Sequence, residues 1–533
     1  MKHTAILPAL GFAILMAGAP LQQSYAANPI LPMWEYIPDG EPYVFEDPDN
    51  PGKFRVYLYG SHDNLVTEYC GRDQVVWSAP VDNLNEWRFD GVIFTSTRDA
   101  NGNLLYANGQ GDVLYAPDVA EVVDSKGKKT YYLYPNNQAW GRNGMVAKAS
   151  RPDGPFDVCN WDPENPKHTI GDLRFDPGVL VDGEKVYAYW GFEESNGAEL
   201  DPSTMATIVQ GTLHKDLIPS SKQEGVFRFF EASSMRKIKD KYVLVYSRVT
   251  GDGEFGLPAT NYTLAYAYSD SPIGPFTYGG TIIDGRGREK GKDGKTVYTA
   301  HPFGNTHGSI IEINGQWYVF YHRQCGTTEY NRQAMVAPIE VNVTEGPGGK
   351  VEISEGEYTS EGFELGGLNP LERHSAGIAC HYTGPEGTRQ SYPNYYHSGS
   401  YVEALRPKIN EGDKAYDLRI NHGPVVNNTA GSVVGYKYFN FDHLGGKKAK
   451  LLAELIPAGI AGGFDVLIDN PYTGRRIGYA DISGLPAVKP TEISIDLSDT
   501  KNLKGKHALY FVFKSPAAGQ SVCKLNNFVF TAE

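Results

Sequence analysis

Cysteine is scarce in this sequence. The 533 residues contain five cysteines, which are Cys70, Cys159, Cys325, Cys380 and Cys523. No two of them form a Cys-x-x-Cys pair, which argues against a zinc ribbon or a thioredoxin-like redox motif. The odd number leaves at least one thiol unpaired within a monomer. Buried free thiols explain the pattern as well as a disulfide between Cys380 and Cys523 does.

Long apolar runs are also missing, and so is an excess of positive charge. The apolar run at residues 5–16 follows Lys2, precedes Ser24-Tyr25-Ala26 and is too short to span a bilayer. It predicts a signal peptide over residues 1–27, and therefore a secreted or periplasmic protein. The 49 Lys and Arg residues against 63 Asp and Glu give a net charge of −14. This charge argues against nucleic acid and anionic membrane as partners.

A five-fold repeat organises residues 28–345. Each repeat has a polar residue, a short strand-like run, a polar turn and an aromatic-rich strand that contains a conspicuous tyrosine. The polar residues are Asp39, Asp118, Asp176, Glu231 and His307, and the tyrosines are Tyr59, Tyr134, Tyr189, Tyr246 and Tyr321. Repeats of short strands at such a period are typical of propeller blades. Because the innermost strand of every blade lines a shared axis, we expect the five polar side chains to converge on one central site.

The composition changes after residue 345. The Gly- and Glu-rich span 346–367 is interpreted as a linker between two domains, because 533 residues exceed a single core. Residues 368–533 contain further short strands without the repeat, which suits a β-sandwich of the jelly-roll kind. The strand candidates are residues 432–441, 450–458, 463–470, 475–482, 491–497, 507–514 and 526–532. The predicted fold class is all-β: a five-bladed β-propeller followed by a β-sandwich.

Each polar residue of the repeat also has an ordinary structural explanation. An aspartate at the start of a strand is usually a turn former, and a single histidine usually completes a hydrogen-bond network. Glu231 differs, because a carboxylate between Phe230 and Ala232 has no turn role. Burial there would raise its pKa towards that of an acid catalyst. Convergent carboxylates in an aromatic pocket are what glycosidic hydrolysis requires, with one acid for the leaving oxygen and one base for the water.

At these positions the chain resembles family 43 of the glycoside hydrolases, whose fold is a five-bladed propeller. The resemblance covers residues 31–343 and implies that Asp39 is the general base and Glu231 the general acid. It implies that Asp176, in a Phe-Asp-Pro motif, orients the acid and tunes its pKa. It also implies substrate contacts from Tyr69, Asp118, Phe175, His307 and Arg332. Glu231 is followed by Ala-Ser where the family often has Gly-Pro, which affects the choice of substrate more than the role of the acid.

The C-terminal region resembles a family 6 carbohydrate-binding module. The similar segments are residues 435–441, the turn at 469–478, and the last strands at 505–513 and 525–530. Lys524 and Asn527 stand where such a module carries its cleft residues, so a domain that only supports the propeller is the alternative. The chemistry requires no cofactor. A structural calcium ion is implied either near His307 through water or on Glu403 and Asn526.

Together these features predict a secreted, inverting glycoside hydrolase that acts on plant polysaccharide or on glycans containing arabinose, xylose or galactose. An α-L-arabinofuranosidase or a β-xylosidase is the first expectation, and a galactan-type exo-hydrolase is the alternative. A non-catalytic, lectin-like propeller would have no reason to keep the whole acid–base set. A transfructosidase-like enzyme is rejected, because Ile37-Pro38-Asp39-Gly40 lacks the Asn-Asp-Pro nucleophile motif. We expect a monomer that binds an oligosaccharide or polysaccharide.

Overall fold

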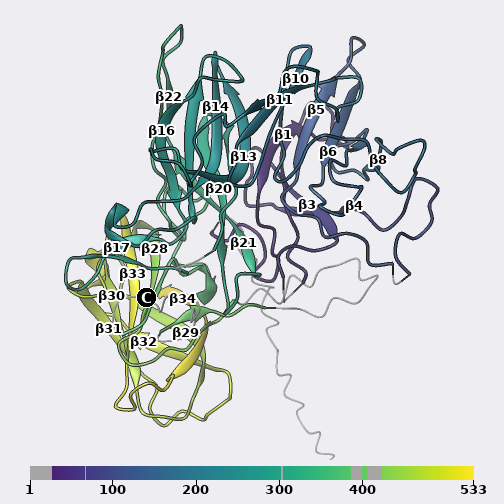
Figure 1. The fold of residues 1–533 in the computed structure, drawn as a ribbon. Helices are drawn as coiled ribbons and strands as arrows, with labels where there is room; N and C mark the ends of the chain where they lie inside the picture. The colour runs from purple at the N-terminus through teal and green to yellow at the C-terminus, as the bar shows by residue number, and fades with distance from the viewer. Residues whose placement is uncertain (1–26, 66–67, 108, 302–303, 386–398, 406–422) are drawn as a thin grey trace, which may run out of the picture.

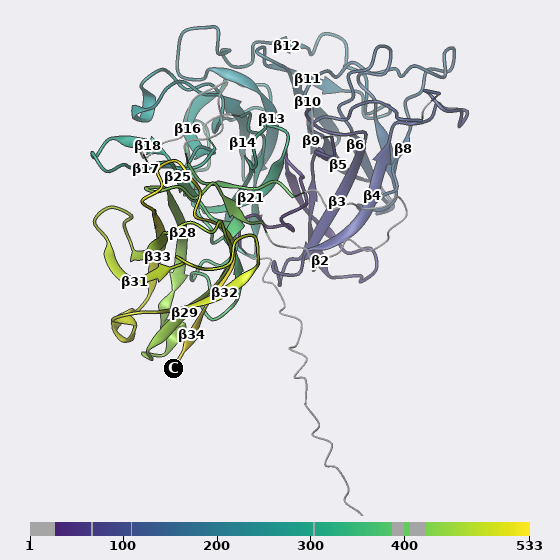
Figure 2. The same ribbon diagram turned by 90° about the horizontal axis from the view of Figure 1, so that it is seen from below.

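The computed structural model describes residues 27–65, 68–107, 109–301, 304–385, 399–405 and 423–533. The predicted signal peptide therefore lies almost wholly outside the described residues. In Figure 1 the chain forms a large β-sheet body, coloured purple to teal, and a smaller one, coloured green to yellow. Figure 2 shows the two bodies side by side from below. The helices in the described part are four single turns of 3₁₀ type, which agrees with the predicted all-β fold class.

The larger body is built from five antiparallel sheets, which confirms the predicted five blades. Four of them have four strands in sequence order and the fifth has three. The first two blades contain β1 Glu41–Glu46, β2 Phe54–Tyr59, β3 Asp73–Pro80 and β4 Arg88–Thr95, then β5 Asp118–Val123, β6 Lys129–Tyr134, β7 Ala147–Ala149 and β8 Asp157–Val158. The third and fourth contain β9 Gly178–Asp182, β10 Lys185–Trp190, β11 Asn196–Leu200 and β12 His214–Lys215, then β13 Phe229–Ile238, β14 Lys241–Arg248, β15 Thr263–Ser269 and β16 Thr277–Asp284. The fifth contains β19 Ser309–Ile313, β20 Gln316–Gln324 and β21 Arg332–Ile339.

The ring of blades closes between the first and the fifth. Gly40, just before β1, forms a parallel bridge with Gly308, just before β19. The N-terminal segment runs beside β21, where Ile30 N–H donates to the carbonyl oxygen of Ala334 at 3.1 Å. The Asn28 amide exchanges two hydrogen bonds with the backbone of Val336, at 2.7 and 2.9 Å. An early segment of the chain thus completes the last blade, which ties the two ends of the propeller together.

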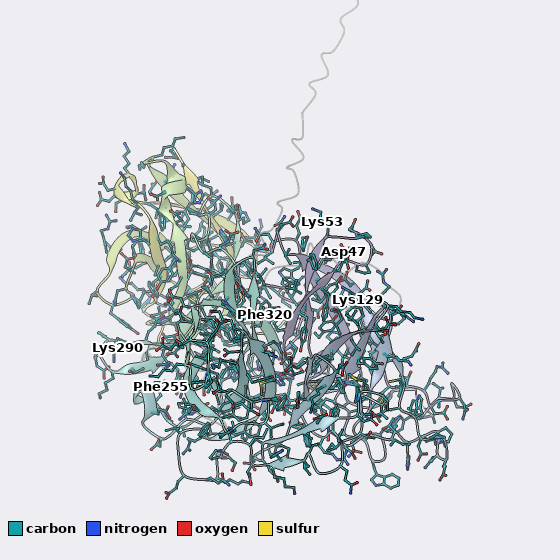
Figure 3. The ribbon with its side chains drawn as sticks, turned by 90° about the horizontal axis from the view of Figure 1, so that it is seen from above. Asp47, Lys53, Lys129, Phe255, Lys290 and Phe320 are labelled. Carbon is teal, nitrogen blue, oxygen red and sulfur yellow. The ribbon has the colours of Figure 1, made fainter. Side chains whose placement is uncertain are left out.

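The inner strands crowd together at the axis. A Cβ atom on Gly178, at the start of β9, would collide with the carbonyl oxygen of Ser233, and one on Gly308 would collide with that of Phe320. Glycine is therefore required where the strands approach most closely. At the other end of the first blade, Figure 3 labels Asp47 and Lys53, which are in the turn between β1 and β2. The pocket described below lies at the end of the propeller where the inner strands begin.

The smaller body is the predicted sandwich of two sheets. One has the order β26-β27-β34-β29-β32, with β24 paired to β34, and the other has the order β25-β28-β33-β30-β31. The strands of the first are β24 His374–Ser375, β26 Tyr401–Val402, β27 Val425–Val426, β29 Ala449–Pro457, β32 Thr491–Asp496 and β34 Cys523–Ala532. Those of the second are β25 His381–Thr383, β28 Val433–Asn440, β30 Gly463–Ile468, β31 Arg475–Asp481 and β33 Lys506–Lys514. Each of the seven predicted strands is present within a few residues of its expected bounds.

The span interpreted as a linker is packed instead. Its first part belongs to a hairpin of β22 Val341–Val343 and β23 Val351–Ile353, a companion to the short hairpin of β17 Arg288–Lys290 and β18 Thr296–Tyr298. Farther on, Tyr358 is buried, and the ring of Phe363 stacks on Trp87 of the propeller with ring centroids 6.2 Å apart. The linker was predicted from the many glycines and glutamates of residues 346–367. The span is packed because its aromatic side chains are buried.

The remaining compositional predictions concern thiols and membranes. All five cysteines lie in the described part of the chain and are free thiols, four of them buried, so Cys380 and Cys523 form no disulfide. Across the described residues, no helix has the length and hydropathy needed to cross a membrane.

Candidate active site

A pocket of about 370 Å³ opens at the propeller axis. It is lined by four of the five polar residues of the repeat and by side chains from the loops around them. The lining residues are Asp39, Tyr69, Cys70, Tyr115, Ala116, Phe175, Asp176, Phe192, Phe230, Glu231, Asn261, Gly304, Asn305, His307, Glu329 and Arg332. The structure thus brings together Asp39, Asp176, Glu231 and His307, as the repeat predicts, and it adds the predicted Tyr69, Phe175 and Arg332.

Asp39 is held in a fixed orientation just before β1. Its backbone has φ 60°, a left-handed conformation that an aspartate rarely adopts. Ser61 Oγ donates to one carboxylate oxygen, and the backbone N–H of Asp39 donates to Nδ1 of His322 at 3.2 Å. Burial lowers the pKa of His322 to about 3, so its imidazole is neutral and can accept this hydrogen bond.

Arg332 binds Asp39 from the side of blade five. Its Nη1 lies 2.9 Å from Oδ1 of Asp39, while Nε and Nη2 each lie 2.9 Å from an oxygen of Asp63. The guanidinium therefore bridges two buried carboxylates, and its N–H groups are used within the protein. The sequence predicts that Arg332 contacts substrate; the structure places it in the pocket wall and gives it the additional task of orienting Asp39.

The pKa of Asp39 is the result of opposing effects. Burial alone would raise the pKa of this carboxyl, but the positive charges of Arg332 and His307 and the hydrogen bond from Ser61 together hold it below its usual value. Asp39 is therefore ionised at neutral pH, as a base that activates water must be.

Glu231 has the opposite electrostatic setting. It is the third residue of β13, where the ladder with β14 has a bulge, and the next residue, Ala232, has φ 67°. The side chain is 6 % exposed. Burial first, and then the negative charge of Asp176, raise the pKa of Glu231 well above its ordinary value. The raised pKa keeps Glu231 protonated to a higher pH than an ordinary glutamate, which suits a proton donor.

Asp176 connects the acid to the rest of the axis. Its backbone has φ 52°, its Oδ2 accepts the backbone N–H of Ala232 at 3.2 Å, and its Oδ1 accepts the side-chain amide of Asn136 at 2.9 Å. The two hydrogen bonds fix a negative carboxylate beside Glu231. This placement suits the predicted role of Asp176 in orienting the acid and raising its pKa.

His307 lies between two carboxylates. Its Nδ1 is 3.6 Å from Oδ2 of Asp176, and its Nε2 is 3.6 Å from Oε1 of Glu41. Burial opposes the charged imidazolium, yet the neighbouring carboxylates of Asp176, Glu41 and Asp39 keep the pKa of His307 well above its usual value. The imidazolium offsets part of the negative charge that the carboxylates bring to the axis.

Aromatic rings form one wall of the pocket. Tyr115 lies 5.8 Å from Phe175, Phe175 lies 5.7 Å from Phe192, and Phe192 lies 5.0 Å from Phe230, all between ring centroids. On the other side Tyr69 donates its hydroxyl hydrogen to Glu329 and lies under the guanidinium of Arg332. Rings beside polar groups suit a sugar, which has apolar C–H faces and polar edges.

Asp118 is the one repeat residue that lies outside the pocket, contrary to the expected substrate contact. It is the first residue of β5, and it does not line the pocket. Its oxygens accept hydrogen bonds from the Tyr43 hydroxyl and from the backbone N–H of Val179, both at 2.6 Å. Burial and the charge of Glu41 raise the pKa of Asp118 to about 7. Its contacts join three inner strands, which is a structural task.

The residues expected to hold calcium do not fit a calcium site. Calcium takes six to eight oxygen ligands. The carboxylate of Glu403 is bound by the ammonium group of Lys524, which would repel a cation, and the amide of Asn526 donates to Glu454 at 2.9 Å. Around His307 and elsewhere in the described residues, no three acidic, histidine or cysteine side chains are grouped as a metal site.

The two residues at the cleft position of the expected carbohydrate-binding module also bind other protein groups. Asn527 is buried, and its side-chain oxygen accepts a hydrogen bond from Arg373 at 2.6 Å. Lys524 pairs with Glu403 at the surface, so both residues have partners within the domain.

Sequence reasoning missed the residues that hold the carboxylates. Ser61 and Asn136 each follow the repeat tyrosine of their blade by two positions, so the ends of the second strands supply the partners of Asp39 and Asp176. The same repeat that located the acids could have located these residues. Asp63, Phe192 and Glu329 come from loops with no repeat signal.

Comparisons with known proteins identify the family of this chain. The sequence profile of glycosyl hydrolases family 43 matches residues 47–345. A protein named xylosidase/arabinosidase from Thermoclostridium stercorarium is 32% identical over 526 residues, which are 95% of this chain and 99% of that protein. An arabinoxylan arabinofuranohydrolase from Paenibacillus polymyxa is 24% identical over 98% of this chain and 79% of its own length. The solved structure of a family 43 arabinoxylan arabinofuranohydrolase from Bacillus subtilis aligns with 95% of this chain and 97% of its own, at 21% identity and a TM-score of 0.45. On the profile match and the full-length alignment, this chain belongs to family 43 of the glycosyl hydrolases.

Proposed function

We propose that this glycoside hydrolase removes α-L-arabinofuranosyl or β-D-xylosyl residues from arabinoxylan-type glycans by a single displacement with inversion. The substrate class rests on the names of the relatives, which are xylosidase/arabinosidase and arabinoxylan arabinofuranohydrolase. The predicted signal peptide supports export of the enzyme to the place where such polymers are found.

One observation carries the mechanism: the pocket shifts the pKa values of two carboxyls in opposite directions. The pKa of Asp39 is lowered while that of Glu231 is raised. Pairs of titratable groups whose surroundings separate their pKa values mark an acid and a base. The two residues therefore have different protonation states at the same pH, which hydrolysis of a glycoside requires.

The reaction then assigns one step to each group. Glu231 donates its proton to the glycosidic oxygen as the bond to the anomeric carbon breaks. Asp39, held by Arg332 and Ser61, takes a proton from the water that attacks the opposite face of that carbon. Asp176 holds Glu231 in its protonated state until transfer, and the aromatic wall covers the sugar. Water adds across the bond, and the leaving chain carries the acid's proton.

A glycoside panel with early product analysis tests this proposal. The enzyme is offered 4-nitrophenyl α-L-arabinofuranoside, β-D-xyloside and β-D-galactoside, and proton NMR records the first-formed sugar before mutarotation. We expect hydrolysis of the arabinofuranoside or the xyloside and a product of the opposite anomeric configuration. Retention of configuration would refute single displacement, and preferred hydrolysis of the galactoside would replace the proposed substrate with a galactan-type one.

A further inference from the structure

One polar side chain of the catalytic pocket has no role in the mechanism derived above. Asn261 lines the pocket from the loop of residues 249–262, which connects β14 to β15, and it is half-buried. Its backbone carbonyl oxygen accepts a hydrogen bond from Ser247 Oγ at 3.1 Å. Its side-chain amide, in contrast, forms no hydrogen bond with any residue that the structure describes. The amide therefore has both a donor and an acceptor available to a molecule in the pocket.

Most other polar side chains of the pocket already have partners within the protein. Arg332 binds Asp39, Asn136 binds Asp176, and Tyr69 binds Glu329. The side-chain oxygen of Asn305 accepts a hydrogen bond from Nη1 of Arg332 at 3.4 Å. The proton of Glu231 is reserved for the glycosidic oxygen in the proposed mechanism. Asn261 is thus an uncharged side chain whose full hydrogen-bonding capacity is open to the substrate.

The residues on both sides of Asn261 are fixed. Thr250 N–H donates to the carbonyl oxygen of Thr260 at 2.8 Å, and Thr260 N–H donates to Oγ1 of Thr250 at 3.0 Å. On the other side, Tyr262 is buried, and its hydroxyl accepts the backbone N–H of Gln324 at 3.0 Å. A ligand that binds Asn261 therefore has little backbone freedom to remove, which favours a specific contact.

Two arginines hold the outer part of the same loop. Arg286 is buried and binds Asp284 through Nε at 3.0 Å and Nη2 at 2.7 Å, while its Nη1 donates to the carbonyl oxygen of Pro258 at 2.8 Å. The guanidinium of Arg288 lies over the ring of Phe255, 3.9 Å from its centroid, and Figure 3 labels this phenylalanine. These contacts keep the loop, and with it Asn261, in one place in the pocket wall.

The chemistry of an amide indicates what Asn261 can bind. A carboxylate only accepts hydrogen bonds and a guanidinium only donates them, whereas an amide does both. A sugar ring carries neighbouring hydroxyl groups, each of which can donate and accept. One amide can therefore accept from one hydroxyl and donate to the next without adding a charge beside the catalytic carboxylates.

We propose that Asn261 determines specificity by binding two adjacent hydroxyl groups of the sugar in the pocket. The inference rests on the proposed function, because it takes that sugar to be an arabinofuranosyl or xylosyl residue, both of which have adjacent hydroxyl groups. It adds that the contact is made with the terminal sugar and that Asn261 moves no proton.

Asn261→Ala measures the contribution of the amide. We expect it to lower kcat/KM on the 4-nitrophenyl glycoside about tenfold, which is the size expected for the loss of one or two neutral hydrogen bonds. Both limbs of the pH profile should stay in place, since an amide does not titrate; a shifted limb would overturn the proposal. Asp252→Ala is the matched control, because Asp252 is exposed in the same loop and does not line the pocket.

Deoxy substrates decide whether hydroxyl groups are what Asn261 binds. Each hydroxyl of the best 4-nitrophenyl glycoside of the panel is replaced in turn by hydrogen, and kcat/KM is measured for the wild type, Asn261→Ala and Asp252→Ala. The electronic effect of a missing oxygen on bond cleavage is the same in all three enzymes and cancels in the comparison. Loss of either of two adjacent hydroxyls should cost the wild type and Asp252→Ala about tenfold and Asn261→Ala less than about twofold. Equal costs in all three enzymes, or coupling to a single hydroxyl, would overturn the two-hydroxyl contact.

The choice of substrate separates this inference from the proposed function. If the galactoside is the best substrate, the proposed substrate class fails, and the deoxy galactosides then decide the role of Asn261. Normal hydrolysis of the arabinofuranoside or the xyloside with equal deoxy costs would refute the role of Asn261 alone. If no glycoside is hydrolysed, saturation-transfer NMR with L-arabinose, D-xylose and D-galactose measures the contact without turnover. Binding weakened by Asn261→Ala would then support the contact, and unchanged binding would refute it.

Discussion

Replacing Glu231 with alanine should remove the proton donor and little else. In the part of the chain that the structure describes, the carboxyl of Glu231 forms no hydrogen bond with a protein group, so no partner is left unsatisfied by the change. Burial and the negative charge of Asp176 raise the pKa of this carboxyl well above its usual value. A buried carboxyl without a partner costs stability, so the variant should unfold at the same temperature as the wild type or at a higher one.

The size of the rate loss follows from the leaving group. General acid catalysis contributes about 10²- to 10⁴-fold, which corresponds to about 2.7 to 5.4 kcal/mol of transition-state stabilisation. A sugar alkoxide needs that proton as the bond breaks, so kcat on an oligosaccharide should fall by the full factor. 4-Nitrophenolate leaves without protonation, so kcat on the aryl glycoside should fall about tenfold or less.

The assay measures kcat for both substrates in the wild type, in Glu231→Ala and in Glu199→Gln. Glu199 is a matched control, because its carboxylate pairs with Lys185 at the protein surface, 2.7 Å away, and not in the pocket. Thermal unfolding followed by circular dichroism checks the fold of each variant. An equal loss on both substrates in a variant that unfolds normally would refute Glu231 as the acid.

Three further outcomes follow from the site and the domain contact. Asp176→Asn removes the negative charge that raises the pKa of Glu231. Because Glu231 loses its proton in the alkaline limb of the pH profile of kcat/KM, this limb should move to lower pH. An unmoved limb would show that the charge of Asp176 does not raise the pKa of Glu231. Arg332→Lys keeps the positive charge but loses the guanidinium N–H groups that hold Asp39, so it should lower kcat and destabilise the protein by about 3 kcal/mol in denaturant unfolding. An unchanged free energy of unfolding would mean that the hydrogen bonds of Arg332 are dispensable. A chain that ends at residue 367 should unfold at a lower temperature than the full protein, and equal unfolding temperatures would show that the propeller stands alone.

The blades could be predicted because the repeat records them directly. Alternation of apolar and polar residues marks the strands, and equivalent positions in a ring must face the same axis. The repeat could not show how each polar side chain is aimed. Asp39 and Asp176 precede their strands with positive φ and line the pocket, whereas Asp118 begins its strand and binds Tyr43 and Val179 outside it. Backbone conformation, which spacing does not encode, decides between a catalytic and a structural role.

The sequence could not predict which groups bind the carboxylates of Asp39 and Asp63, because these groups are distant in sequence. Arg332 reaches Asp39 and Asp63 across 293 and 269 residues of sequence, so only the closed ring brings them together. The prediction of a linker at residues 346–367 was wrong for a similar reason. Its glycines describe the turns, but Tyr358 and Phe363 are buried against segments that the composition of 346–367 cannot reveal.

The contacts between the two bodies favour a supporting role for the sandwich. Arg323 of β20 is fully buried, and its guanidinium donates to the carbonyl oxygens of Ala379 and Gly377 at 2.8 and 2.5 Å. Beside it, the backbone N–H of Gly326 donates to the carbonyl oxygen of Val402 at 2.7 Å, and the loop that begins there carries Glu329 of the pocket. A charged group buried in the propeller thus depends on the sandwich for two of its acceptors, and a hydrogen bond to the sandwich holds one pocket loop. Loss of the sandwich should therefore weaken substrate binding as well as stability, because the support of blade five and the shape of the pocket rest on the same contacts.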